Sequence, residues 1–161
     1  LFLLLVVLIS CSPAGKRTQI EPDIPNVPCR GKFSRSVIFN KRNAEKYEKD
    51  FKADEFWTPA AEDIDTVENE IMGFLEGLGA EKENLIPQGT RKFLSHNIKR
   101  YTCQYIGTVR NDQRYIRCNF FIDDDRFKGW ERDWIFHEEN YHYWGILYNY
   151  DLKEIESVTC N

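Results

Sequence analysis

Apolar residues recur at helical spacing between Thr58 and Gly79. Thr58 is a good N-cap residue, and Pro59 suits the first turn of a helix. Gly77 and Gly79 are typical of a helix end. The pattern predicts one long amphipathic helix, whose apolar positions are Ile64, Val67, Ile71, Phe74, Leu75 and Leu78. A shorter helix is expected from Lys41, on the apolar positions Ala44, Tyr47 and Phe51.

From Ile98 onward apolar positions alternate with polar ones, as in half-buried β-strands. A two-residue turn at Asn111-Asp112 joins the first two strands and pairs residues whose numbers add up to 223. Further strands are expected over Arg132–Glu138 and Tyr141–Tyr150, and the segment Ile155–Cys160 is expected at the sheet edge. This order of elements predicts an α+β fold, in which an N-terminal helix packs on a curved antiparallel sheet of four to five strands.

The chain opens with an uncharged apolar run, Leu1–Ile9. A bilayer-spanning helix needs about 20 residues, so this run has instead the length of a signal-peptide core. The sequence Leu8-Ile9-Ser10-Cys11 resembles the lipobox of bacterial lipoproteins, in which the signal is removed before a cysteine that then receives diacylglycerol. The resemblance implies lipidation of Cys11, and Ser12 implies sorting to the outer membrane of a two-membrane bacterium.

These observations divide the chain into a signal peptide over residues 1–10, a tether over 11–31 and one domain over 32–161. We expect the signal to be truncated at its start, because neither an initiator Met nor a basic segment precedes the apolar run. Prolines recur at every third position of the tether, which favours an extended conformation. A cleaved secretory signal with an incidental cysteine, or a buried strand, are the alternatives for the apolar run.

Three short motifs carry a second resemblance. They are Phe56-Trp57-Thr58-Pro59, Tyr101-x-x-Gln104-Tyr105-x-Gly107 and Asn119-Phe120-Phe121. Together they resemble a family of small uncharacterised bacterial lipoproteins with a cystatin-like or NTF2-like domain. The resemblance covers residues 56–150 and implies a fold, without an established reaction.

Cysteine usage is consistent with export. Apart from Cys11, the chain has four cysteines, Cys29, Cys103, Cys118 and Cys160. An even number in an exported chain allows two disulfides, in three connectivities. Cys103 and Cys118 lie diagonally on one face of the predicted hairpin, which is slightly long for a bridge. Cys29 and Cys160 would then remain as partners, and buried free thiols are the alternative.

Composition narrows the function classes. The chain has 161 residues, 14% aromatic residues and a net charge of −4, so it lacks the basic footprint of a nucleic-acid-binding protein. Charge is uneven, with eight Lys/Arg against three acids from Arg30 to Lys52, and ten acids against one lysine from Asp54 to Glu83. The basic block is expected to be a solvated surface, with anionic lipid headgroups as the other interpretation.

Motifs for catalysis and metal binding are incomplete. His137 and His142 are five residues apart, whereas a zinc-protease helix needs two histidines four apart on one face. Asp123-Asp124-Asp125 lacks the glycine and the distal glutamate of a calcium loop. The sequence contains no nucleophile elbow, P-loop or dinucleotide motif. We therefore expect no enzyme activity, no metal and no cofactor.

Aromatic residues are the main candidates for binding. Tyr and Trp side chains on both faces of a sheet are typical of contacts with a partner. The candidates are Tyr101, Tyr105, Trp134, Trp144 and Tyr148. The resulting hypothesis is a lipid-anchored cell-envelope protein that acts as a non-enzymatic binding or interaction module, with a protein partner or a small ligand.

Two alternatives stay open. The first is a periplasmic immunity or inhibitor protein, whose acidic helix contacts the partner. Neutralising Glu68, Glu70 and Glu76 should then weaken binding at low salt. The second is an enzyme with an NTF2-like cup that moves a proton. The groups available for this are Tyr105, Tyr148 and Asp133.

Overall fold

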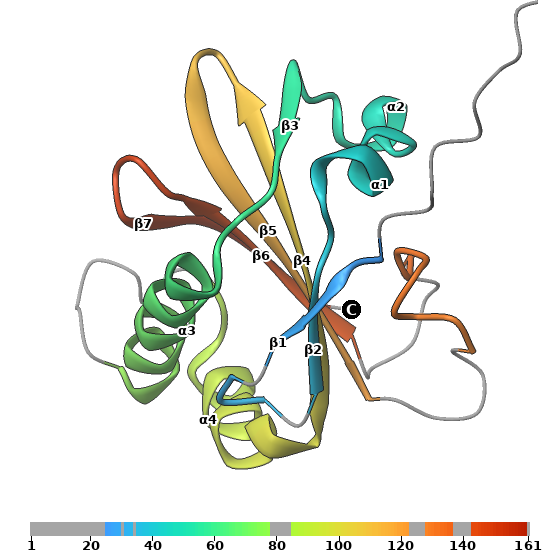
Figure 1. Ribbon diagram of the computed structural model, residues 1–161. Helices are drawn as coiled ribbons and strands as arrows, with labels where there is room; N and C mark the ends of the chain where they lie inside the picture. The colour runs from blue at the N-terminus through green and yellow to red at the C-terminus, as the bar shows by residue number, and fades with distance from the viewer. Residues whose placement is uncertain are drawn as a thin grey trace, which may run out of the picture.

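The computed structural model describes residues 25–29, 31–33, 35–77, 85–122, 128–136 and 143–160 (Figure 1). The helices within these parts are α1 (Lys41–Glu45), α2 (Glu48–Phe51), α3 (Ala61–Glu76) and α4 (Gln88–Asn97), and a 3-10 turn, Ile98–Arg100, follows α4. The strands are β1 (Val27–Cys29), β2 (Arg35–Ile38), β3 (Glu55–Trp57), β4 (Tyr101–Arg110), β5 (Gln113–Ile122), β6 (Tyr143–Asn149) and β7 (Glu154–Cys160).

The strands form one seven-stranded sheet in the order β1-β2-β4-β5-β6-β7, and β3 also pairs with β4. Helices α3 and α4 lie on one side of the sheet and α1 and α2 on the other, as Figure 1 shows. Each side has its own apolar cluster. We call the two sides the α3 face and the α1 face. The α+β class is confirmed, with more strands than the four to five expected.

The second half of the chain forms the predicted meander. Asn111 and Asp112 connect β4 to β5 with φ angles of 52° and 61°, as two-residue hairpin turns require. The two strands pair in the predicted register, so Gln104 lies opposite Asn119. Strands β6 and β7 continue the antiparallel pairing, and β7 is the strand expected at the sheet edge.

The first part of the chain adds strands that the sequence pattern does not predict. Strand β2 runs parallel to β4, with Ser36 opposite Cys103, so the sheet is not wholly antiparallel. Strand β3 pairs antiparallel with the other end of β4. Strand β1 lies at the free edge beside β2, although its residues belong to the segment expected as a tether. Pro28 is tolerated there because an edge strand does not need its N–H as a donor.

Thr58 is not the N-cap of the long helix. The N-cap of α3 is Ala60, whose N–H donates to Asp63 Oδ2 at 2.8 Å. The Thr58 hydroxyl instead accepts from the N–H of Lys41 at 2.7 Å. An acid in the first turn thus satisfies the backbone donor that the threonine was expected to satisfy.

The short helix expected from Lys41 is divided into α1 and α2. Asn40 Oδ1 accepts from the N–H of Asn43 at 2.9 Å and caps α1. The chain leaves helical geometry at Tyr47, with φ −102° and ψ 15°, and the buried Tyr47 ring packs edge-on against Phe39. The apolar positions were therefore predicted correctly, but they lie on two short helices and the turn between them rather than on one continuous helix.

The third strand expected over Arg132–Glu138 is wrong in its described part, because residues 132–136 form no strand. Their backbone groups bond to the side chains of Gln104 in β4 and Asn119 in β5 rather than to the backbone of a neighbouring strand. We call residues 128–136 the covering segment. Helix α4 has no counterpart among the predicted elements, since Gly89 and Thr90 in its first turn have low helix propensity.

Candidate functional site

The aromatic residues proposed for binding lie in two places. Trp134 lies on the α1 face and is partly exposed. The other four are buried on the α3 face, with no more than 2% of their surface exposed: Tyr101, Tyr105, Trp144 and Tyr148. Within this group the Trp144 ring stacks on Phe120, with 3.8 Å between ring centres. These four side chains pack the core, so a partner on the surface does not touch them.

The four cysteines within the described residues are free thiols. Cys103 and Cys118 keep the diagonal arrangement predicted from the hairpin, without a bridge between them. Cys29 belongs to β1 and Cys160 to β7, at opposite edges of the sheet. The pairing of Cys29 with Cys160 expected by elimination is therefore incompatible with this topology.

A buried acid contacts the sheet from α3. Glu68 is 0% exposed, Tyr105 Oη donates to Glu68 Oε1 at 2.6 Å, and the N–H of Lys32 donates to Oε2 at 2.6 Å. Both carboxylate oxygens therefore have donors. The expectation that Glu68 belongs to an acidic surface is wrong, because it lies four residues after Ile64 and three before Ile71 on the apolar stripe of the helix.

The chain passes closely over this carboxylate at Gly31. A Cβ atom there would lie 2.0 Å from Glu68 Oε1, so the site requires glycine. Burial raises the pKa of Tyr105 well above its usual range, and Cys103 and Glu68 add to the shift. Burial also raises the pKa of Cys29 to about 11, again with Glu68 contributing. Tyr105 and Cys29 therefore stay protonated at neutral pH. The Glu68–Tyr105 pair is closed to solvent.

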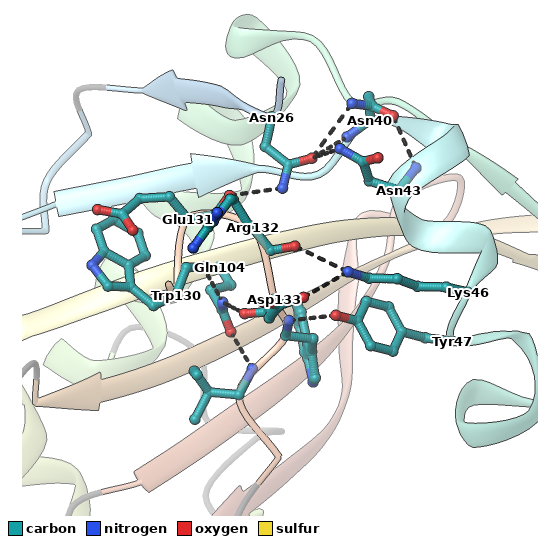
Figure 2. Close-up of polar contacts among 12 residues, drawn as sticks. Asn26, Asn40, Asn43, Lys46, Tyr47, Gln104, Trp130, Glu131, Arg132 and Asp133 are labelled. Atoms are coloured by element: carbon teal, nitrogen blue, oxygen red, sulfur yellow. Dashed lines mark hydrogen bonds and ion pairs between the residues drawn. The ribbon is translucent and has the colours of Figure 1, made fainter. Parts of the chain in front are cut away.

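The covering segment is fixed to the α1 face by the side chain of Gln104 (Figure 2). Gln104 Nε2 donates to the carbonyl oxygens of Trp130 and Asp133 at 2.6 and 2.7 Å. Its Oε1 accepts from the N–H of Ile135 and from Asn119 Nδ2, both at 2.9 Å. Gln104 is 0% exposed, so these bonds satisfy an amide that is buried in the sheet.

Contacts from the turn between α1 and α2 and from the chain before β1 complete this attachment (Figure 2). The N–H of Trp134 donates to Tyr47 Oη at 2.6 Å, and Lys46 Nζ pairs with Asp133 Oδ1 at 2.8 Å. Asn26 Nδ2 donates to a carbonyl oxygen of the covering segment at 2.8 Å. The polar crevice between these groups, about 470 Å³, is lined by exposed charged side chains and is a solvated surface feature.

A groove of about 290 Å³ opens on the α1 face beside the covering segment. Its aromatic wall consists of Phe51, Trp134 and Phe136, and Phe136 is 50% exposed. The Phe51 ring centre lies 5.3 Å from that of Trp134 and 6.3 Å from that of Phe136. Residues of β6 and β7 also line the groove: Gly145, Ile146, Leu147, Ser157 and Thr159.

Two buried polar atoms of residues that line this groove have no hydrogen-bond partner, Arg117 Nε and Asn119 Oδ1. Arg117 Nη2 donates to the carbonyl oxygen of Phe51 at 3.2 Å, and the guanidinium lies 4.8 Å above the Phe51 ring. Among the described residues, no acid forms an ion pair with Arg117. Burial lowers the pKa of Arg117, and Arg110 adds to the shift.

The groove therefore offers a specific chemistry. A ligand atom that accepts a hydrogen bond would satisfy Arg117, and a donor would satisfy Asn119 Oδ1. The aromatic wall would contact a flat apolar group. Concave sites that combine apolar walls with a few fixed polar atoms are typical of small-ligand binding.

The hairpin register contains one signal for this site that the sequence analysis did not use. Positions 104 and 119 add up to 223, so Gln104 and Asn119 are two amides directly opposite each other in the hairpin. Such a pair indicates a buried polar contact. Arg117 has no comparable signal, because a charged residue in an alternating strand is usually solvated.

Some predicted features lie outside the described residues: Cys11, the tether up to residue 24, Asp123-Asp124-Asp125, His137 and His142. In the parts of the chain that the structure does describe, no group of three or more His, Cys, Asp or Glu residues is placed to hold a metal ion. The same parts contain no helix that is long and apolar enough to cross a membrane.

Comparisons with protein-family models, with curated proteins and with solved structures find no match to this chain. Inferences about its function therefore depend on the groove and on the sequence.

Proposed function

We propose that this chain is a non-enzymatic binding module of the cell envelope, and that its ligand site is the groove on the α1 face. The observation that carries the proposal is the pair of unpartnered atoms, Arg117 Nε and Asn119 Oδ1, beside three aromatic rings. Leaving a buried polar group unpaired costs about 1–3 kcal/mol. A ligand that pairs both atoms would recover this free energy on binding.

The envelope part of the proposal is supported by the apolar run Leu1–Ile9 and by Cys11. Diacylglycerol on Cys11 would supply two acyl chains, which suffice for stable anchoring, here in the outer membrane of a two-membrane bacterium. The intact mass of the natively expressed protein tests this. We expect a mature chain that begins at Cys11 and carries the diacyl mass, and an unmodified Cys11 would refute the anchor.

We also propose a cystatin-like or NTF2-like relationship for the domain. The packing of α3 on the β4–β7 meander supports it.

N-acetylphenylalanine is a suitable probe of the groove, because it carries a carboxylate for Arg117, an amide N–H for Asn119 and a ring for the aromatic wall. We expect it to change Trp134 fluorescence saturably and to bind at least about tenfold more weakly to the Arg117→Met variant. The Arg132→Met variant is the control, since exposed Arg132 lines the solvated crevice instead. Equal affinity for Arg117→Met and the unaltered protein would exclude the groove as the binding site.

The immunity-protein alternative keeps one specific support. Four acids on α3 are exposed, namely Glu62, Asp65, Glu70 and Glu76, and they would attract a basic partner. Neutralising these four together, with Glu68 left intact, should weaken capture of such a partner at low salt. Retained binding in that variant would leave the groove as the better site. The enzymatic alternative is disfavoured because its three candidate groups are not brought together. Tyr105 and Tyr148 are buried on the α3 face, whereas Asp133 lies exposed on the α1 face, paired with Lys46.

A further inference from the structure

A second cavity lies between the C-terminal end of α3 and the N-terminal end of α4. Its volume is about 630 Å³, which exceeds that of the groove. Its lining includes Gln88 and Gly89 from the first turn of α4, the next basic pair, Arg91 and Lys92, and Glu76 at the end of α3. This cavity belongs to the other side of the sheet and shares no residue with the groove.

The first turn of α4 presents uncapped backbone donors to this cavity. Its N-cap is Pro87, which forms no side-chain cap, and no acid occurs in the first turn. The N–H of Arg91 makes the first helical bond, to the carbonyl oxygen of Pro87 at 3.0 Å. The N–H groups before it have no acceptor within the helix, and the helix dipole adds positive potential at this end.

Arg91 provides an independent indication of a ligand. Only 8% of its surface is exposed, and it lines the cavity. The guanidinium of Arg91 forms no hydrogen bond, ion pair or ring contact within the described parts of the chain. The guanidinium nitrogens of Arg91 are not among the fully buried atoms without a partner, so they reach the cavity that the residue lines. An anion in the cavity would pair with this guanidinium, and Lys92 beside it would add a second positive charge.

We propose that this cavity binds the phosphoryl group of a small soluble molecule. The guanidinium of Arg91 matches the planar, bidentate geometry of phosphate oxygens, and helix N-termini bind the same group through their N–H groups. The cavity is larger than one phosphate, so it leaves space for an attached organic group. The carboxylate of Glu76 opposes the anion and limits its affinity.

Titration of the full chain with inorganic phosphate and with glycerol phosphate, followed by backbone amide NMR at constant ionic strength, tests the proposal. We expect saturable shifts in the amides of residues 88–92. The Arg91→Lys variant should bind about tenfold more weakly, because lysine cannot form the bidentate contact. The Lys92→Met variant should bind about threefold more weakly, and Glu76→Gln about twofold more tightly.

Lys99→Met is the matched control, because it removes an equal exposed charge beyond the other end of α4. It should leave the affinity unchanged. Lys92 and Glu76 are exposed, so their variants keep the fold even if Arg91→Lys does not. Equal phosphate affinity in the Lys92→Met, Glu76→Gln and unaltered proteins would overturn the proposal, as would shifts spread over lysines elsewhere. Because the groove plays no part, this result is separable from that of the proposed function.

Discussion

The two faces of the sheet are both covered, but by different kinds of interaction. The α3 face is closed by a continuous apolar cluster, which contains the hydrogen bond between Tyr105 and Glu68 and two unpartnered atoms that line none of the cavities described above, Trp144 Nε1 and Tyr148 Oη. The α1 face is closed by directional bonds from Gln104 to the covering segment, and it leaves unpartnered atoms at Arg117 and Asn119. Apolar contacts persist when side chains shift slightly, whereas a hydrogen bond weakens steeply when its distance or angle changes. We therefore expect the α3 face to contribute most of the folding stability and the α1 face to bind the ligand.

The largest effect is expected from Glu68→Ala, which removes the hydrogen bond between Tyr105 and Glu68 on the α3 face. The change leaves the hydroxyl of Tyr105 and the N–H of Lys32 unpaired and creates a cavity. We expect the free energy of unfolding to fall by about 3–5 kcal/mol, measured by urea denaturation. Glu70→Ala, on the exposed side of the same helix, is the control and should change it by less than about 0.5 kcal/mol. Similar values for the two variants would mean that Glu68 is solvated.

Gly31→Ala tests whether the backbone at Gly31 passes directly over the Glu68 carboxylate, and it does so without changing Glu68 itself. The added Cβ would collide with Glu68 Oε1, so we expect a loss of about 2–3 kcal/mol in the free energy of unfolding. Gly89→Ala is the matched control, because a Cβ there meets nothing within 4 Å. Thermal denaturation of both variants gives the comparison. A Gly31→Ala protein as stable as the control would show that the chain does not pass over the acid.

Gln104→Ala should loosen the covering segment on the α1 face without unfolding the rest of the protein. The covering segment loses three backbone partners, whereas the ladder between β4 and β5 remains. We expect a global loss of only about 1–2 kcal/mol, with amide exchange at Ile135 accelerated and that of the β5 amides unchanged. Uniform acceleration in both sets would contradict the division between the two faces.

The smallest effect concerns the thiol of Cys29 at alkaline pH. Its pKa is raised from 9.0 to about 11 in the folded protein, chiefly by burial. The folded state therefore holds a proton that the unfolded chain loses above its own pKa. The contribution of Cys29 to stability is complete below about pH 9 and is lost as the pH rises towards 11. Stability measured against pH should fall less steeply in Cys29→Ser, and parallel curves would exclude this cause.

Much of the meander could be predicted because its strands are long and its turn is specific. Ten-residue strands show a clear period of two, and Asn111-Asp112 fixes the register of the whole hairpin. Strands β1, β2 and β3 have only three or four residues each, too few to show alternation. Their existence depends on pairing with distant segments, which no local pattern contains.

The candidate site was less predictable than the fold. Tyr101 and Trp144 were selected for their residue type, which does not distinguish a core position from an exposed one. Gln104 acts through four hydrogen bonds to groups distant in the sequence, three of them in a segment without regular structure. Arg117 and Arg91 are informative only because neighbours pack around them and no acid in the described parts of the chain pairs with them. Burial and the absence of a partner are properties of the fold.

The parallel pairing of β2 with β4 has a consequence for the order of folding. Ser36 lies opposite Cys103, a separation of about half of the domain, whereas the contacts of the meander join strands that are adjacent in the sequence. Closing a long loop costs entropy before its contacts form, so distant pairings generally form late. The N-terminal strands thus emerge first from the ribosome but acquire partners only after β4 has been synthesised. If the chain crosses a membrane unfolded, this order of folding is favourable, because no stable N-terminal structure forms early that would have to unfold first.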